Sequence, residues 1–261
     1  MDETTRFDLM IDALVELAQE EQAHQTPPVP GLPTLRSVLA DASPLPREAL
    51  FLGLAEDGLP VLLNVHDPVP GPILITGDQA SGKTRLLQNI AHAADLLHMP
   101  TEVQYVVITP YPKEWNFFKG NQNNAGVYST QNSNAEELLQ SLVSWAHNNR
   151  GEEQSVLMLV DDIEAVIKLN SQVEQNLRWL FMRGPTRRVW PIVTLNASRC
   201  YEMKEWTGFF RTRLFGHVKN LEESTFITGD PKYTLTHLIT GSQFALREGH
   251  ELLNFWNPIF D

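Results

Sequence analysis

Short apolar runs alternate with longer amphipathic stretches from about residue 50 to the end of the chain. Five of these runs have the length and continuous hydrophobicity of strands that are buried on both faces, as in a parallel sheet. They cover residues 72–76, 103–109, 155–160, 192–195 and 214–218. Helices are predicted between them, at 85–91, 135–148 and 172–183. The alternation predicts an α/β fold with a mostly parallel central sheet and helices on both faces.

Local signals add detail to this outline. Residues 51–54 and 61–65 are predicted to form one hairpin, and residues 243–246 and 252–255 another. Asn134 precedes the helix at 135–148, and Glu137 stands three residues later, which predicts a capping box.

Residues 77–84 carry a complete G-x-x-x-x-G-K-T phosphate loop between a predicted strand and a predicted helix. Gly77 and Gly82 permit tight turns, while exposed N–H groups and the positive end of the helix cradle phosphates. Lys83 is expected to reach the β- and γ-phosphates of ATP, and Thr84 to ligate Mg²⁺. The predicted nucleotide-binding residues are Gly77, Asp78, Gln79, Ala80, Ser81, Gly82, Lys83, Thr84 and Arg85.

Two acids, Asp161 and Asp162, follow the apolar run at 155–160, where ligands bind at the carboxyl edge of a parallel sheet. Asp161 is predicted to hold Mg²⁺, and Asp162 to orient or deprotonate the attacking water, with Glu164 as the substitute for Asp162. The competing interpretation makes both aspartates N-capping residues of a helix that starts at Ile163.

Upstream of the phosphate-loop domain, residues 4–25 have helical amphipathic spacing, residues 26–33 form a Pro-rich linker, and a short helix is predicted at 35–40. We therefore divide the chain into an N-terminal helical arm, 1–45, and a P-loop ATPase domain, 46–261. The arm is expected to dock on a protein partner or a neighbouring subunit, or else to pack on its own domain.

Charge and composition narrow the partners. The net charge of −12 argues against a generic nucleic-acid binder, yet residues 178–219 hold nine bases against two acids. These bases either form a surface for an anionic partner, or some of them pair with the acidic N-terminus (residues 1–67) of the same or a neighbouring chain. The one cysteine, Cys200, is expected to be a packing residue, and no apolar run reaches the ~18 residues of a membrane span, so a cytoplasmic protein without membrane insertion is predicted.

Several features in colinear order resemble the motor domain of the FtsK/HerA superfamily. Residues 108–115 resemble its strand followed by Asp-Pro-Lys, residues 194–196 its Ala-Thr-Gln, residues 212–215 its Thr-Arg-Ile-Ala-Phe strand, and residues 241–246 its closing hairpin. The resemblance covers roughly residues 50–257. It departs where Asp162 replaces Glu, where Asn196 replaces Gln, and where Arg-Pro-Ser is missing.

The resemblance implies a RecA-like P-loop NTPase fold and a homo-oligomeric ring, hexameric in that family, with ATP hydrolysed at subunit interfaces. It makes Asn196 the polar sensor of the γ-phosphate. A trans arginine is also implied; the candidates are Arg187, Arg188, Arg211 and Arg213, of which Arg211 and Arg213 are included in the predicted catalytic set with Lys83, Asp162 and Asn196.

Three functions follow from this set. The first is a double-stranded DNA translocase in which the bases of residues 178–219 face a channel. The second is a protein-handling motor similar to the type VII secretion ATPases. The third is an assembly or regulatory module that binds ATP and barely hydrolyses it, because the shorter side chain of Asp162 positions water poorly.

Overall fold

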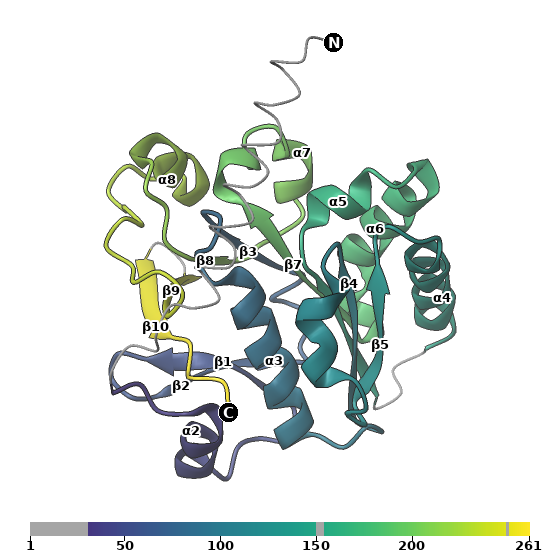
Figure 1. The fold of residues 1–261 in the computed structure, drawn as a ribbon, viewed down its shortest axis with the longest axis horizontal. Helices are drawn as coiled ribbons and strands as arrows, with labels where there is room; N and C mark the ends of the chain where they lie inside the picture. Colours follow the sequence, from purple (N-terminus) through teal and green to yellow (C-terminus); the bar gives the residue numbers. More distant parts are fainter. Residues whose placement is uncertain (1–30, 150–153, 249–250) are drawn as a thin grey trace.

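The computed structural model of the chain describes residues 31–149, 154–248 and 251–261. The helix predicted at 4–25 and the turn at Gly249 lie outside the described residues. The described strands form one ten-stranded sheet in the order β2-β1-β10-β9-β8-β3-β7-β6-β4-β5 (Figure 1). The strands are β1 (Ala49–Ala55), β2 (Pro60–Asn64), β3 (Ile73–Gly77), β4 (Val103–Thr109), β5 (Asn124–Ser129), β6 (Ser155–Val160), β7 (Val189–Asn196), β8 (Thr212–Phe215), β9 (Gln243–Glu248) and β10 (Glu251–Trp256).

Six neighbouring strands, β8-β3-β7-β6-β4-β5, run parallel, whereas β9, β10, β1 and β2 continue the sheet in antiparallel order. All residues of β3 and β6 are buried, as their continuous apolar sequences predict. The α/β fold with a mostly parallel central sheet is therefore confirmed, and the antiparallel strands belong to the two hairpins that the sequence also predicts.

Helices cover both faces of the sheet (Figure 1). On one face, α3 (Lys83–Leu97) packs with Ile73 and Ile75 of β3 and with Leu157 of β6. On the other, α4 (Asn134–Asn148) and α6 (Ser171–Arg183) pack with Leu74, Met158 and Val160. Alternate residues of each strand thus enter two separate hydrophobic cores, because successive strand side chains point to opposite faces.

The short helix α2 (Leu35–Ala42) packs on the sheet domain. Leu35, Val38 and Leu39 are buried in one cluster with Phe51 of β1 and Ala93 of α3. The Leu35 N–H donates to the Ile259 carbonyl oxygen at 3.0 Å, which ties the start of the helix to the C-terminal segment. The described part of the predicted arm is thus integrated into the ATPase fold, and the division at residue 45 stays a prediction.

Three details differ from the sequence expectations. Asn134 is the first residue of α4, and its N-cap is Ser133, whose side chain makes no capping bond; Ser133 has helical backbone angles, so the predicted capping box does not form. The predicted strand at 214–218 ends at Phe215, because the residues after it bond to the phosphate loop instead.

The third difference is a set of elements that carried no clear periodic signal. They are β5, α5 (Ile163–Ile167), α7 (Lys204–Thr207) and α8 (Leu221–Thr228), together with three 3₁₀ turns: η1 (Pro112–Phe118), η2 (Pro185–Arg187) and η3 (Ala197–Arg199). Among the described helices, none is both long and apolar enough to cross a membrane.

Replacing Leu35 by Ala tests whether α2 belongs to the core. Leu35 is 0% exposed, so we expect Leu35→Ala to lower the free energy of unfolding by ~2–5 kcal/mol, the range for buried leucines. Leu59, which is 63% exposed, is the matched control, and Leu59→Ala should change stability by less than ~0.5 kcal/mol. Urea unfolding of the full chain measures both. Equal stabilities of the two variants would show that α2 does not contribute to the core.

Candidate functional site

The predicted site residues meet at the carboxyl edge of the parallel strands. Gly77 at the end of β3 is paired with Asn196 at the end of β7, and β6, which ends immediately before Asp161, pairs with β7 on its other side. Because these strands are parallel and adjacent, the loops that follow them converge on one place.

The phosphate loop requires glycine at its second turn. Gly82 has φ +93°, and a Cβ atom there would lie 2.7 Å from the Gly241 Cα atom. The loop is also held by bonds to two other segments: the Asp78 N–H donates to the His217 carbonyl oxygen at 2.9 Å, and the Gly241 N–H donates to the Ser81 carbonyl oxygen at 3.1 Å. Gly82 thus allows the backbone of the segment before β9 to approach the loop.

The N-terminus of α3 is left uncapped by side chains. Its N-cap residue, Gly82, makes no side-chain capping bond, whereas α2, α6 and α8 are capped by Thr34, Asn170 and Asn220. The N–H groups of a first helical turn have no intrahelical acceptors, and the helix dipole adds positive charge there. This arrangement fits a phosphate group.

Lys83 lies at the centre of the loop. Its Nζ donates to the carbonyl oxygens of Gly77 and Asp78 at 3.1 and 2.6 Å and to Asn196 Oδ1 at 2.9 Å. Burial lowers the pKa of the Lys83 ammonium to about 8, against the opposing effect of nearby Asp161. The structure thus brings together Lys83 and Asn196, two residues that the sequence assigned to the γ-phosphate.

Thr84 and Asp161 form the second contact across strand ends. The Thr84 hydroxyl lies 3.0 Å from both carboxylate oxygens of Asp161, and the Thr194 hydroxyl donates to Asp161 Oδ1 at 3.1 Å. Asp161 is 6% exposed, and burial raises the pKa of its carboxyl group. In phosphate-binding sites, Mg²⁺ is bound by protein oxygens such as a carboxylate and a hydroxyl. The Thr84–Asp161 pair therefore fits the predicted Mg²⁺ ion.

Asp162 has a different environment from Asp161. It is the N-cap of α5 with φ +76°, and its Oδ1 accepts the N–H groups of Glu164 at 3.0 Å and Ala165 at 3.4 Å. Its own N–H donates to the Thr194 hydroxyl at 2.7 Å. The capping interpretation therefore holds for Asp162 and not for Asp161. Among the described residues no hydrogen bond reaches Asp162 Oδ2.

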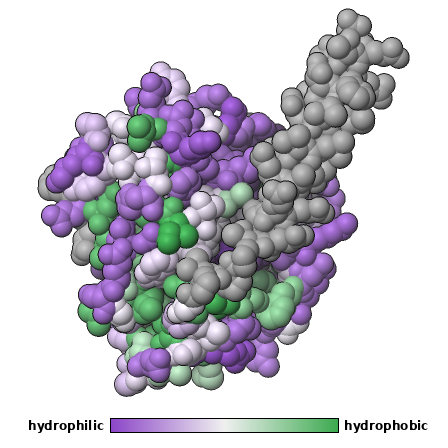
Figure 2. Space-filling model, turned by 60° about the vertical axis from the view of Figure 1, so that its left-hand side comes forward, coloured by the Kyte–Doolittle hydropathy of each residue, from purple (hydrophilic) through white to green (hydrophobic). Residues whose placement is uncertain are grey.

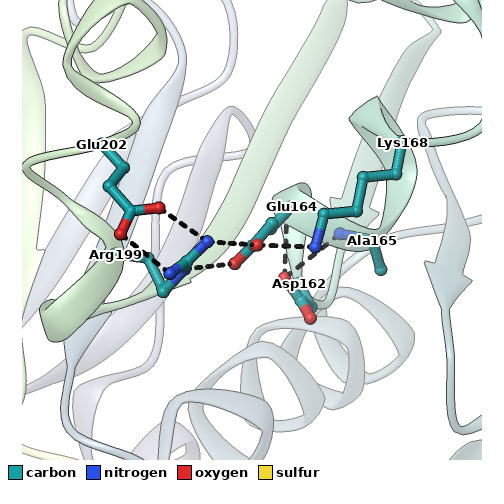
Figure 3. Close-up of polar contacts among 6 residues, drawn as sticks. All are labelled: Asp162, Glu164, Ala165, Lys168, Arg199 and Glu202. Atoms are coloured by element: carbon teal, nitrogen blue, oxygen red, sulfur yellow. Dashed lines mark hydrogen bonds and ion pairs between the residues drawn. The ribbon is translucent and has the colours of Figure 1, made fainter. Parts of the chain in front are cut away.

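Glu164, the substitute named for Asp162, is held by two cations (Figure 3). Arg199 Nε and Nη2 lie 2.9 and 2.8 Å from Glu164 Oε2 and Oε1, and Lys168 Nζ lies 2.7 Å from Oε1. The hydrogen bond from Arg199 is the main cause that lowers the pKa of the Glu164 carboxyl. The local sequence does not predict this contact, because Glu164 and Arg199 are 35 residues apart.

The candidate trans arginines lie away from the phosphate loop. Thr212 is paired with Ile73 at the start of β3, so Arg211 and Arg213 lie near the opposite edge of the sheet from Lys83. Arg213 donates to the carbonyl oxygens of Phe210 at 3.2 Å and Thr207 at 3.0 Å, whereas Arg211 is exposed. The backbone of both residues therefore lies toward the start of β8, away from the phosphate-loop end of β3.

Other bases of residues 178–219 also have partners within the chain. Arg178 pairs with Glu174 and stacks on Trp206, Arg187 donates to the Asn149 carbonyl oxygen, Arg188 donates to the Val65 carbonyl oxygen, and Arg199 pairs with Glu164 and Glu202. With Arg213, five of the nine bases are engaged internally. Within the described residues, only Arg178 and Arg199 of these bases pair with acids, and these acids lie outside residues 1–67, so pairing of the bases with the acidic N-terminus stays a prediction.

One contact of the site lay outside the sequence predictions, whereas the environment of Cys200 agrees with them. The segment after β8 closes on the loop, since the Lys219 N–H donates to Asp78 Oδ2 at 2.7 Å. A glycine directly after an apolar strand, Gly216, is the only sequence feature we find that could have indicated this approach. Cys200 is buried, and burial raises the pKa of its thiol to about 12, as a packing role predicts.

Two cavities, of about 90 and 290 Å³, lie elsewhere: one beside Arg47 and Glu102, the other beside Tyr128 and Glu137. Neither is lined by a residue of the phosphate loop.

No family model matches the sequence, and no curated protein matches it either. Solved structures do match. EssC (ATPases 2 and 3) from Geobacillus thermodenitrificans has a TM-score of 0.71 at 14% identity over 89% of this chain and 48% of that chain. EccC (ATPases 2 and 3) from Thermomonospora curvata, in complex with a signal sequence peptide, has a TM-score of 0.68 at 15% identity over 90% of this chain and 45% of that chain.

A third match is the pCW3 conjugation coupling protein TcpA with ATPγS, at a TM-score of 0.64 and 13% identity over 86% of this chain and 68% of that chain. The chain spans less than half the length of the EssC and EccC chains. At these identities the matches show the fold alone: this chain shares the α/β fold of these solved structures.

Proposed function

We propose that this chain is an ATP-binding and ATP-hydrolysing subunit of a homo-oligomeric FtsK/HerA-type ring. The observation that carries the proposal is the pair of contacts across strand ends, Lys83 with Asn196 and Thr84 with Asp161, at the uncapped start of α3. Phosphoryl transfer needs phosphate-binding groups, a cationic side chain and metal ligands in one place. These residues supply all three at one edge of the sheet.

In this proposal the loop N–H groups of residues 77–85 bind the phosphates of ATP, and Lys83 neutralises the β- and γ-phosphates. Thr84 and Asp161 would hold Mg²⁺, which would supply neutralisation of the charge on the phosphates. Asn196 lies beside Lys83 and senses the γ-phosphate. Asp162 orients the attacking water through Oδ2, because Oδ1 accepts the capping bonds of α5.

Two features of Asp162 support slow turnover. Its capping bonds fix the carboxylate toward α5, and an aspartate side chain is one methylene shorter than the family's glutamate. The hypothesis of a weakly hydrolysing module and the hypothesis of a motor therefore share the same set of site residues. They differ in the expected rate of ATP hydrolysis.

A neighbouring subunit completes the site in this proposal. Arg211 is the better trans arginine, since it is exposed, whereas the Arg213 guanidinium is held by two backbone carbonyl oxygens of its own chain. We also propose a cytoplasmic location, in keeping with a single, buried thiol.

The cargo is either double-stranded DNA or a polypeptide. DNA translocation requires bases that face a channel, and only Arg183, Lys204, Arg211 and Lys219 of the nine lack a side-chain contact described above. Of these, Lys219 lies at the phosphate-loop edge and Arg211 near the opposite edge, so they do not form one stripe. A polypeptide cargo fits this distribution and the net charge of −12 better, and EccC has been solved with a signal sequence peptide.

Lys83→Ala should abolish ATP binding, because no other side chain of the loop supplies an ammonium to the phosphates. Asp161→Ala should keep nucleotide affinity within about tenfold but remove its dependence on Mg²⁺. Calorimetric titration with ATPγS, with and without Mg²⁺, measures both. Lys119→Ala, an exposed lysine outside the site, is the control. If Lys83→Ala binds ATPγS as the parent does, the assigned site is wrong.

Arg211→Ala should lower ATP turnover by about 10³-fold or more without changing ATP affinity, since trans arginines act on the transition state. Arg213→Lys should affect stability more than turnover, because Arg213 anchors backbone carbonyl oxygens. Mixing Arg211→Ala with Lys83→Ala subunits should restore activity in mixed assemblies. Failure of that complementation would place the arginine elsewhere.

Linear duplex DNA should leave the ATPase rate unchanged at physiological salt if the cargo is a polypeptide. A DNA motor would instead be stimulated by duplex, and log affinity would fall against log salt with a slope of about −0.9 per phosphate contact. Turnover with and without duplex across a salt series decides between them. Stimulation that Lys204→Glu weakens would restore the DNA hypothesis.

A further inference from the structure

Glu164 is more tightly held than any other acid near the phosphate loop. We call the three residues Glu164, Arg199 and Lys168 the Glu164 clamp (Figure 3). Arg199 binds the carboxylate with two nitrogens, Nε to Oε2 and Nη2 to Oε1, and Lys168 binds Oε1. Both oxygens of the carboxylate are therefore engaged, and two-pronged arginine–carboxylate contacts are the stronger kind of ion pair.

The clamp joins the ends of two strands that carry the site. Glu164 is in the first turn of α5, two residues after Asp162, which caps that helix. Arg199 ends η3, three residues after Asn196, and Asn196 accepts a hydrogen bond from Lys83. Glu164 and Arg199 thus lie in the two segments that follow β6 and β7, a few residues along the chain from Asp162 and Asn196.

Exposure differs between the partners. The Glu164 side chain is 16% exposed, whereas that of Arg199 is 38% exposed. Arg199 also pairs with Glu202, Nη2 to Oε2 at 2.7 Å, so a second acid already competes for the same guanidinium. An acidic group presented by another chain could reach Arg199 from solvent and draw it away in the same manner.

We propose that Glu164 is a second water-orienting carboxylate, that Arg199 is the positioning residue that restrains it, and that release of Arg199 raises ATP turnover. This inference rests on the proposed ATPase function. Asp162 then supports a slow basal rate through its one uncommitted oxygen, and the clamp keeps the longer glutamate side chain out of use until a partner engages Arg199.

The test is the steady-state ATPase rate of Arg199→Ala in the full chain. We expect kcat to rise roughly three- to tenfold with KM for ATP unchanged, because the loss frees a charged hydrogen-bonding group without altering the phosphate loop. Arg199→Lys, which keeps one cationic contact, should return kcat toward the parental value. In Arg199→Ala/Glu164→Gln the gain should disappear.

Glu202→Gln is the matched control. It removes a charge from the same cluster but touches only Arg199, so kcat should stay at the parental value or fall as Arg199 binds Glu164 alone. Thermal melting of every variant reports any structural role. If the Glu164 clamp only stabilises the packing of α5 against η3, Arg199→Ala should have a lower melting temperature and an unchanged kcat. That result would overturn the inference.

A large fall of kcat in Arg199→Ala would also overturn it, since it would give Arg199 a direct role in the reaction. These failures differ from failure of the proposed function. If the parent binds ATPγS through Lys83 and Arg199→Ala shows no gain, only the clamp inference is wrong. If Lys83→Ala binds ATPγS like the parent, the nucleotide site itself is wrong.

Discussion

The register between β3 and β7 is the constraint on which the site depends. Because Gly77 is paired with Asn196, the phosphate loop and the segment after β7 begin at the same level of the sheet, and Lys83 meets Asn196. The pairing of β6 with β7 sets Asp161 at that level too, within hydrogen-bonding distance of Thr84. A slip of one residue in either pairing would turn alternate side chains to the opposite face and separate these groups. The buried apolar residues on both faces of β3 and β6 oppose such a slip, so the hydrophobic pattern that builds the sheet also determines the chemistry at its edge.

Three neighbouring acids show how context divides one residue type into different roles. Asp161 is buried and raised in pKa, and its burial is tolerated because two hydroxyl groups surround the carboxylate. One carboxylate oxygen of Asp162 accepts the capping hydrogen bonds at the N-terminus of the short helix α5. Arg199 and Lys168 stabilise the ionised form of Glu164 and so lower the pKa of its carboxyl group. A carboxylate with a lowered pKa is a poor proton acceptor, so the three acids are graded in availability for reaction, and the gradation is set by partners on other strands.

The sequence predicts the local parts of this arrangement well and the non-local parts poorly. The phosphate loop, the strand before Asp161 and the two hairpins follow from motif, continuous hydrophobicity and turn residues, which are short-range signals. The start of β5 at Asn124 is hidden in an Asn-rich segment, and α8 buries Ser224 and Thr228 in place of an apolar stripe, so neither has a period to detect. Arg199 with Glu164 and Asp78 with Lys219 join residues that are 35 and 141 positions apart. Such pairs depend on strand order, which the pattern of hydrophobic residues does not specify.

The basic segment illustrates why charge along a sequence is a weak guide to partners. Its nine bases and two acids suggest an anionic ligand when counted in order, yet the fold distributes them over both edges of the sheet and supplies acids from elsewhere, such as Glu164 and Glu174. Arg213 satisfies backbone carbonyl oxygens, which no tally of charges would show. A phosphate backbone attracts bases that face solvent together, because screening limits each charge to about 8–10 Å at physiological salt. Arg178 and Arg199 add little to that field because acids of the chain neutralise them, whereas Arg187, Arg188 and Arg213 bond to neutral carbonyl oxygens and keep their charge.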